Sequence, residues 1–190
     1  MSRHGRTFID ALDSANRGLR AVFVRAGDRF DHAIVAVQEN VETPLLFAAD
    51  LPLQEVVDHQ TFDGRRAVLA TGAGGGQYWS ISVDPIVDAR LAILGFDVAC
   101  RDSPQSASPA VNYLLADNVA LEGHRLLLTD GRLFTVGCGV IPVSIATEFV
   151  PTCHLETSAG QLAFRSDRSP HVSTPRMARW RYEFQFVRPI

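Results

Sequence analysis

The sequence predicts a mainly β fold, an antiparallel β-sandwich or barrel with one short N-terminal helix. Residues 178–187 alternate between apolar and polar side chains, and this period of two is typical of a strand. Asp63-Gly64 and Asp130-Gly131 each separate two strand-like runs, and an Asp-Gly pair favours a hairpin because glycine tolerates positive φ. The turns are closely spaced, and strands do not alternate with helices, which also favours a sandwich or barrel.

The expected helix covers residues 7–17. Thr7 can cap its N-terminus, and Asp10 follows three residues later in a pattern close to a capping box. Gly18 follows as a helix stop. The apolar residues that would share one helical face are Phe8, Ile9, Leu12 and Ala15.

After this segment the pattern of side chains repeats at every second residue, which is typical of strands. Residues 19–25 and 29–38 are expected to be strands joined by a turn at 26–28. His32 lies on the same face of the second strand as Phe30 and Ile34. Because both faces of this strand are partly apolar, it is expected to be central in its sheet.

Two hairpins are expected around the Asp-Gly pairs, and further strands elsewhere bring the total to about ten to twelve. In the second hairpin a two-residue loop would set Leu127 opposite Phe134. Glycines follow both pairs at similar distances, which indicates either a duplicated β-unit or shared turn chemistry. The expected strands are 54–62, 65–71, 77–83, 90–100, 125–129 and 132–136.

Composition indicates an ordinary globular chain. With 190 residues, 46% of them hydrophobic and 21% charged, residues 1–190 are expected to form a single domain that needs no disulfide or metal to hold its core. The net charge of −3 argues against nucleic acid as a partner. Residues 1–5 have no apolar stretch after the arginines, and no run is long enough to span a bilayer, so a cytoplasmic protein without membrane contact is expected.

The chain contains no lysine, so all 18 of its basic residues are arginine. Schiff-base chemistry and P-loop phosphate binding, which both need lysine, are therefore excluded. The three cysteines, Cys100, Cys138 and Cys153, are widely spaced and contain no C-x-x-C pair. A disulfide framework or zinc knuckle is not expected, and no cofactor or metal is predicted.

Acid and imidazole groups occur together at Asp31-His32 and around residues 58–63. The candidate catalytic residues are His32, Asp58, His59 and Asp63, which could supply acid/base chemistry in a hydrolase- or lyase-like enzyme. Neighbouring residues of a strand point to opposite faces, so each would need partners from other strands. The structural alternatives are a core histidine for His32, a solvated edge for Asp58 and a turn role for Asp63.

The glycine-rich segment 71–77 runs into a strand rather than a helix, so it lacks the helix N-terminus of a phosphate site. It is either a connection between strands or a loop that gates a ligand. The candidate ligand-binding residues are Gly74, Gly75, Gln77 and Arg101.

Two functions remain open on the sequence. The first is a non-enzymatic module that binds an unknown small molecule or protein, with a possible homodimer, because short strands leave sheet edges that need covering. The second is the carboxylate/histidine enzyme. Convergence of two histidines with a carboxylate in one concavity would favour the enzyme.

Overall fold

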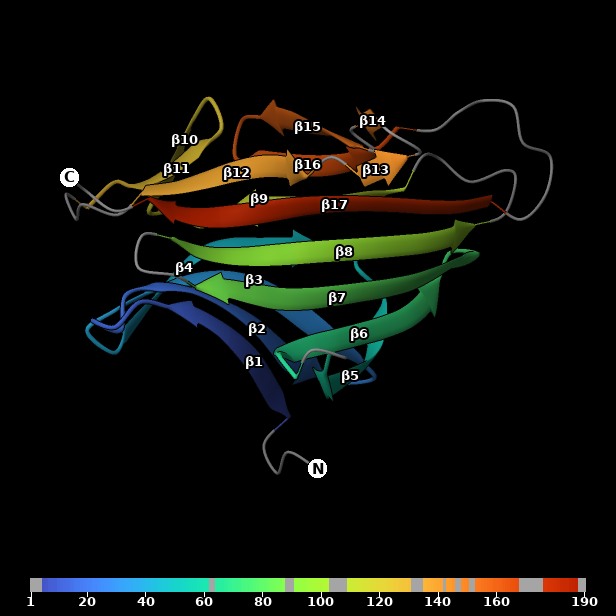
Figure 1. Ribbon diagram of the computed structural model, residues 1–190, viewed down its shortest axis with the longest axis horizontal. Helices are drawn as coiled ribbons and strands as arrows, with labels where there is room; N and C mark the ends of the chain where they lie inside the picture. The colour runs from blue at the N-terminus through green and yellow to red at the C-terminus, as the bar shows by residue number, and fades with distance from the viewer. Residues whose placement is uncertain are drawn as a thin grey trace.

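The computed structural model is built from antiparallel β-strands that form one curled, half-barrel sheet (Figure 1). In the part of the chain that the structure describes, the sheet has 15 strands and folds over so that two arms face each other. The structure describes residues 5–61, 64–87, 91–102, 109–130, 135–141, 143–145, 148–150, 153–167 and 176–187.

The first arm has the strand order β1-β2-β3-β4-β9-β16-β15. β3 is central in it, as the sequence predicts, since it pairs with both β2 and β4. The bounds of the seven strands are β1 Arg6–Leu12, β2 Gly18–Ala26, β3 Arg29–Gln38, β4 Val41–Ala49, β9 Ala110–Leu115, β16 Gln161–Ser166 and β15 Cys153–Ser158.

The second arm has the order β5-β6-β7-β8-β17-β12-β11-β10, and its strands β7, β8 and β17 lie in front of the first arm in Figure 1. A single pair, Phe30 and Leu53, joins β3 to β5 and makes the two arms one sheet. A separate hairpin consists of β13 (Val143–Ile145) and β14 (Glu148–Val150). The second arm has the bounds β5 Leu53–Gln60, β6 Arg66–Gly74, β7 Gln77–Val87, β8 Ala92–Asp102, β17 Arg176–Val187, β12 Thr135–Ile141, β11 Arg125–Leu128 and β10 Val119–Glu122.

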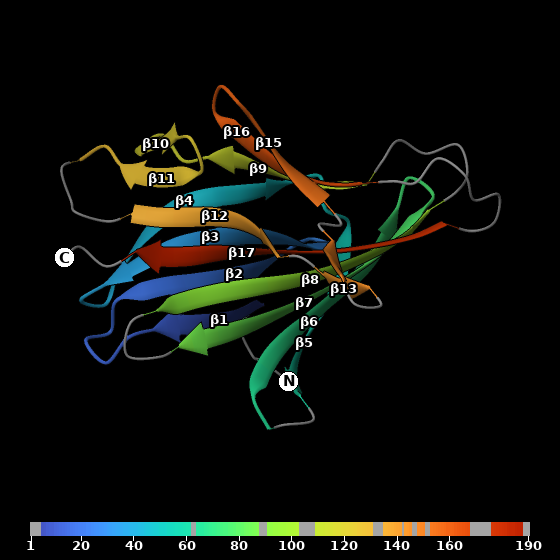
Figure 2. The same ribbon diagram turned by 45° about the horizontal axis from the view of Figure 1, so that its top comes forward.

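The core lies between the arms, and an aromatic stack crosses it (Figure 2 shows the two layers). The Tyr182 ring on β17 stacks on Phe164 of β16, with centroids 3.9 Å apart, and on Phe96 of β8, with centroids 4.8 Å apart. All three side chains are fully buried. The stack therefore fixes the position of β16, in the first arm, against β8 and β17 in the second.

The alternation of the last strand is confirmed. The aromatic side chains of β17 are buried, whereas Arg179 is exposed and forms an ion pair with Asp97 of β8 (2.6 Å). The interleaved arginines and aromatics thus point to opposite faces, and the aromatics belong to the core. The buried members are Trp180, Tyr182, Phe184 and Phe186.

The predicted N-terminal helix is wrong, since the described residues contain no helix and Arg6–Leu12 form strand β1. Pairing with β2 places Ile9 and Ala11 in the core and Phe8 and Leu12 on the outer face. Phe8 and Leu12 are four residues apart, a spacing that shares a face in a strand as well as in a helix. Both faces of β1 carry apolar side chains, which resembles a helical pattern.

The predicted register of the β11–β12 hairpin is wrong by one residue. Leu127 lies opposite Thr135, not Phe134, and Leu126 lies opposite Val136. A shift of one residue would turn a strand's side chains to the other face. The observed register keeps Leu126 and Val136 together in the core.

The glycine-rich segment is a hairpin between β6 and β7. Gly75 and Gly76 form its turn with φ of 58° and 77°, a conformation that glycine adopts without strain. Gly72 is needed for another reason, because β6 runs close to the backbone at Pro52. A Cβ added at Gly72 would lie 1.7 Å from the Pro52 carbonyl oxygen.

Gly72→Ala is therefore expected to lower the free energy of unfolding by about 1–3 kcal/mol, the usual cost of overpacking, or to prevent folding. Gly139→Ala is the matched control, because the nearest atom to its added Cβ would be Glu183 Cγ at 3.7 Å. Urea unfolding of both variants measures the difference. Equal stability of the two variants would contradict the close approach at Pro52.

Candidate functional site

The residues expected to be catalytic occupy different environments. His32 is buried in the core, whereas Asp58 and His59 are exposed on β5. Asp58 forms an ion pair with Arg66 at 2.8 Å. Asp63 lies outside the described residues. The structure therefore does not bring His32 together with Asp58 or His59 in one concavity.

His32 belongs to a buried chain of hydrogen bonds that joins the two arms. Its Nδ1 lies 3.2 Å from the Val22 carbonyl, which can only accept, so Nδ1 carries the proton. Nε2 then accepts from the Tyr113 hydroxyl at 3.3 Å, and Tyr113 accepts from the Tyr182 hydroxyl at 2.8 Å. The ring also stacks on Phe23, with centroids 4.5 Å apart.

Burial keeps this chain of groups neutral. Desolvation lowers the pKa of His32 to about 4, although the hydrogen bond to Val22 acts in the opposite direction. Burial also raises the pKa of both Tyr113 and Tyr182. At neutral pH the three side chains act as an uncharged link between β3, β9 and β17.

The expected ligand-binding residues lie near one another at one end of the second arm, but the side chains of Gln77 and Arg101 point to opposite faces of the sheet. Gly74 and Gly75 lie at the exposed β6–β7 turn. Gln77 begins β7 opposite Asp102, and Tyr78, the next residue, lies opposite Arg101. None of the three hollows described below is lined by these residues.

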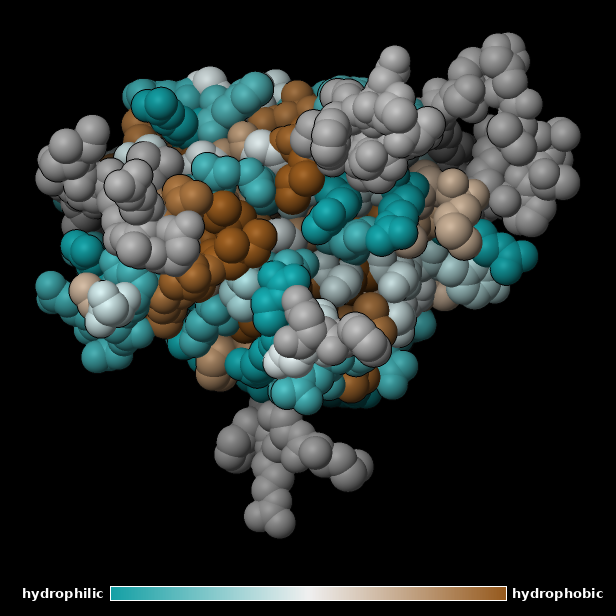
Figure 3. All heavy atoms as spheres, viewed as in Figure 1, coloured by the Kyte–Doolittle hydropathy of each residue, from teal (hydrophilic) through white to brown (hydrophobic). Residues whose placement is uncertain are grey.

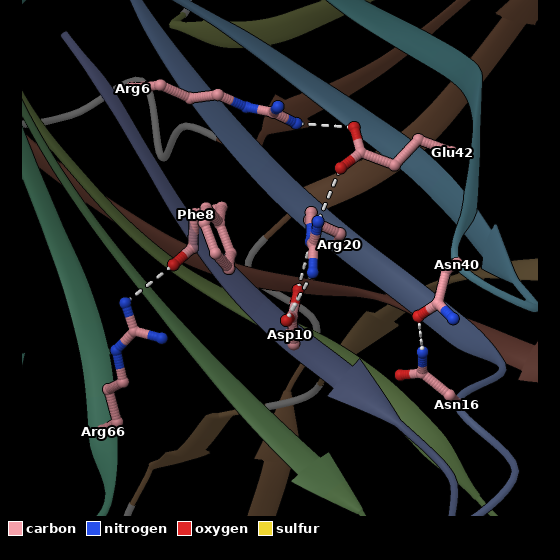
Figure 4. Close-up of polar contacts among 8 residues, drawn as sticks. All are labelled: Arg6, Phe8, Asp10, Asn16, Arg20, Asn40, Glu42 and Arg66. Carbon is pink, nitrogen blue, oxygen red and sulfur yellow. Dashed lines mark hydrogen bonds and ion pairs between the residues drawn. The ribbon is translucent and has the colours of Figure 1, made fainter. Parts of the chain in front are cut away.

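One half of the first arm's outer face is covered by charged side chains (Figure 4). Arg20 contacts Asp10 at 2.5 Å and Glu42 at 2.5 Å, and Arg6 reaches the same Glu42 at 2.5 Å. The Arg20 guanidinium also lies 4.2 Å from the centre of the Phe8 ring. Burial opposes ionisation of Glu42, but hydrogen bonds from Arg6 and Arg20 lower its pKa.

Arg66 forms a hydrogen bond with the backbone of β1. Its Nη2 donates to the Phe8 carbonyl at 2.9 Å (Figure 4). The same guanidinium also donates to Asp58. This contact gives a partner to an edge carbonyl, a group that otherwise invites pairing with another chain. The charged half of the face is thus already occupied by contacts within the protein.

A row of side chains crosses the outer face of the first arm, with residues directly opposite one another on neighbouring strands. We call it the outer row. Its first members are apolar and its last two are polar. Phe47 and Leu114 lie opposite each other near its middle and are both nearly half exposed. The outer row consists of Phe8, Val22, Ala33, Phe47, Leu114, Gln161 and Ser158.

The outer row ends in a hollow of about 360 Å³ on strands β9, β16 and β15. Ala163 occupies its middle, because this short side chain lies between Asn112 on one side and Glu156 on the other. We call it the Ala163 hollow. The polar residues that line the hollow are Asn112, Glu156, Thr157, Ser158, Gln161 and Arg165.

The polar groups around Ala163 are of two kinds. Glu156 is fixed, because its two carboxylate oxygens accept from Arg165 Nε and from His154 Nε2, each at 3.0 Å. The side-chain amides of Asn112 and Gln161 have no hydrogen-bond partner in the described structure and remain available. The hollow thus combines a wall of ion-paired side chains with two amides that have no protein partner among the described residues.

His154 connects this wall to the end of β16. Its Nδ1 lies 2.5 Å from Asp167 Oδ1, so each ring nitrogen faces a carboxylate oxygen. Only the protonated imidazole can donate to both. Hydrogen bonds to Asp167 and to Glu156, in that order of size, accordingly raise the pKa of His154.

Two further hollows lie elsewhere. One is beside the β15–β16 turn and is lined by Leu115, Leu121 and Gly160 among others. The other, of about 750 Å³, lies around Gly137 and includes His124. Neither has an ion-paired wall like that of the Ala163 hollow in the described residues.

An apolar patch lies on the outer face of the second arm. Figure 3 shows it in brown over the neighbouring ends of β7 and β8. Ile86 and Val87 at the end of β7, and Leu91 just before β8, are exposed apolar residues at these strand ends. Nothing in the structure shows what covers this patch.

No metal or membrane feature was found in the parts of the chain that the structure describes. There, no three His, Cys, Asp or Glu side chains are grouped so that they could hold a metal ion. The same residues include no helix that is long and apolar enough to cross a membrane.

Comparisons with protein-family models, with curated proteins and with solved structures found no match for the chain. The function must therefore be argued from the residues themselves.

No local pattern in the sequence predicts the Ala163 hollow. Its residues come from three strands, and β9 is distant in the sequence from the β15–β16 hairpin. One signal was present, since Gln161, Ala163 and Arg165 alternate with Leu162 and Phe164, which predicts a strand with a polar outer face.

The buried His32 predicts a loss of stability in acid. Its pKa is lower in the folded protein than in the unfolded chain, so below pH 6.5 the unfolded chain binds the proton more readily. The free energy of unfolding should fall as the pH drops from 6.5 to 4, by about 3 kcal/mol, and then level off.

Urea titrations between pH 4 and 7.5 measure this effect. His32→Gln should lose this part of the pH dependence, whereas His59→Gln, which leaves His32 in place, should keep it. A wild-type slope that survives in His32→Gln would contradict the assignment to His32.

The His154 contacts predict that Asp167→Asn lowers the pKa of His154, because the principal acceptor loses its charge. Glu156→Gln should lower it less. NMR titration of the imidazole carbon-bound protons provides the measurement. An unchanged pKa in Asp167→Asn would show that this contact does not form in solution.

Proposed function

We propose that the protein is a non-catalytic binding module, and that its ligand site is the Ala163 hollow together with the exposed part of the outer row. The observation that carries the proposal is the arrangement around Ala163, where a small side chain lies among polar groups, two of them unused amides. Ligand sites typically combine a concave surface with a few fixed polar groups.

The placement of the hollow supports binding. It lies on paired strands rather than on a loop, and the Phe164 side chain directly below it is locked in the aromatic stack. Glu156 is held by Arg165 and His154 before any ligand arrives. Preorganisation of this kind lowers the entropic cost of binding.

The chemistry of the described residues supports binding better than catalysis. His32 is buried and Asp58 and His59 are exposed on another strand, so the expected acid/base group is not assembled. The carboxylate and imidazole that do meet, Glu156 and His154, hold each other. We therefore do not propose the hydrolase- or lyase-like activity.

A fragment screen followed by ¹H–¹⁵N NMR tests this function. Compounds that bind should shift the side-chain amide signals of Asn112 and Gln161. Ala163→Phe fills the hollow and should abolish these shifts. Ala99→Phe is the matched control, because Ala99 also lies on an outer sheet face, between Ser80 and Arg179 on the second arm.

The proposal fails if no fragment shifts these amides. It also fails if the shifts persist in Ala163→Phe, or if they gather only around Gly137. The spectrum of each variant shows whether it is folded, so a lost signal can be separated from a lost structure.

A further inference from the structure

We infer that the ligand of this site is a neutral oligosaccharide, an inference that rests on the binding function proposed above. It follows from three properties of the described residues: the balance of charge at the hollow, its mixture of donors and acceptors, and the apolar surface beside it.

The charges at the hollow cancel. Arg165 and the protonated His154 are positive, and Glu156 and Asp167 are negative, and all four are joined in one chain of contacts. A phosphate or carboxylate ligand would find no unneutralised cation in this chain. Complementarity therefore favours an uncharged ligand.

The uncharged polar groups both donate and accept. Asn112 and Gln161 each offer an amide that can donate and accept, and the Ser158 hydroxyl can do both. A sugar hydroxyl also donates and accepts at once, so it can satisfy these groups in pairs. An aliphatic ligand would leave them without partners, which costs binding energy.

The apolar part of the outer row adjoins this polar end. Leu114 lies directly opposite Gln161, and Phe47 lies opposite Leu114. A sugar ring has polar edges and an apolar C–H face, and this face can pack on the exposed Phe47 ring while the hydroxyls reach the amides.

The spacing of the strands favours a chain of sugars over a single one. From Phe47 on β4 to Glu156 on β15 there are three strand spacings, or about 14 Å. One sugar ring cannot contact both ends of this surface. An oligosaccharide laid across the strands can contact them together.

The test uses the full chain with cellopentaose, maltopentaose and chitopentaose as probes, and an uncharged, serine-rich pentapeptide as a comparison. Calorimetric titration gives the affinity of each. At least one pentasaccharide should bind, and should bind more tightly than its own monosaccharide, whereas the pentapeptide should not bind.

Variants locate the contacts. Gln161→Ala and Asn112→Ala should each weaken binding about tenfold, since each removes a hydrogen bond in the complex. Phe47→Ala should weaken it to a similar degree, and Phe47→Trp should retain it. Val24→Ala is the matched control, because Val24 is as exposed as Phe47 and lies away from the hollow. All these positions are exposed, so folding should persist, and thermal unfolding checks this.

The outcomes separate this inference from the binding function. If fragments occupy the hollow but no pentasaccharide binds, the oligosaccharide is wrong and the binding function stands. Tighter binding of the pentapeptide would also overturn it. If neither fragments nor sugars reach Asn112 and Gln161, both are wrong.

Discussion

Tyr182 is the side chain on which both layers of the molecule depend. Its ring lies between Phe96 of the second arm and Phe164 of the first. Its hydroxyl forms a hydrogen bond with Tyr113, and the Tyr113 hydroxyl forms another with His32. Aromatic stacking and a buried hydrogen bond therefore act through one residue. Both interactions are favourable only while the two arms keep their present spacing.

This core contact also determines the outer surface. Successive residues of a strand point to opposite faces, so an inward Phe164 requires an outward Ala163 and Arg165. The same rule applied to β9 turns Tyr113 inward and Asn112 outward. The proposed site therefore lies on the opposite side of β9 and β16 from the buried aromatic side chains.

The two halves of the first arm's outer face have different roles in this account. Around Phe8, arginines and carboxylates satisfy one another and cover the apolar side chains below them. Beyond Phe47, among the residues that the structure describes, the ion pairs lie in the wall of the hollow and the Asn112 and Gln161 amides have no protein partner. The charged half serves stability, and the half with free amides is the one suited to a ligand.

The sequence predicted those strands in which apolar side chains occur at every second residue. The alternation of β17 and the central position of β3 are confirmed, because a buried aromatic or branched residue at every second position identifies a strand without long-range information. The helix at 7–17 failed because Phe8 and Leu12 satisfy both periods, and pairing with β2 decides between them.

The site could not be predicted in the same way. Asn112 meets Ala163 only through the pairing of β9 with β16, and no local pattern specifies which strands become neighbours. His32 was a reasonable candidate by its residue type, but its buried contacts with Val22 and Tyr113 depend on the tertiary fold.

The most direct test of the account is a crystal structure of the protein with a bound pentasaccharide. The account predicts a sugar ring over Ala163, with hydroxyls within hydrogen-bond distance of the Asn112 and Gln161 amides and a second ring on Phe47. A sugar bound over Gly137, or over the apolar patch on the second arm, would contradict it.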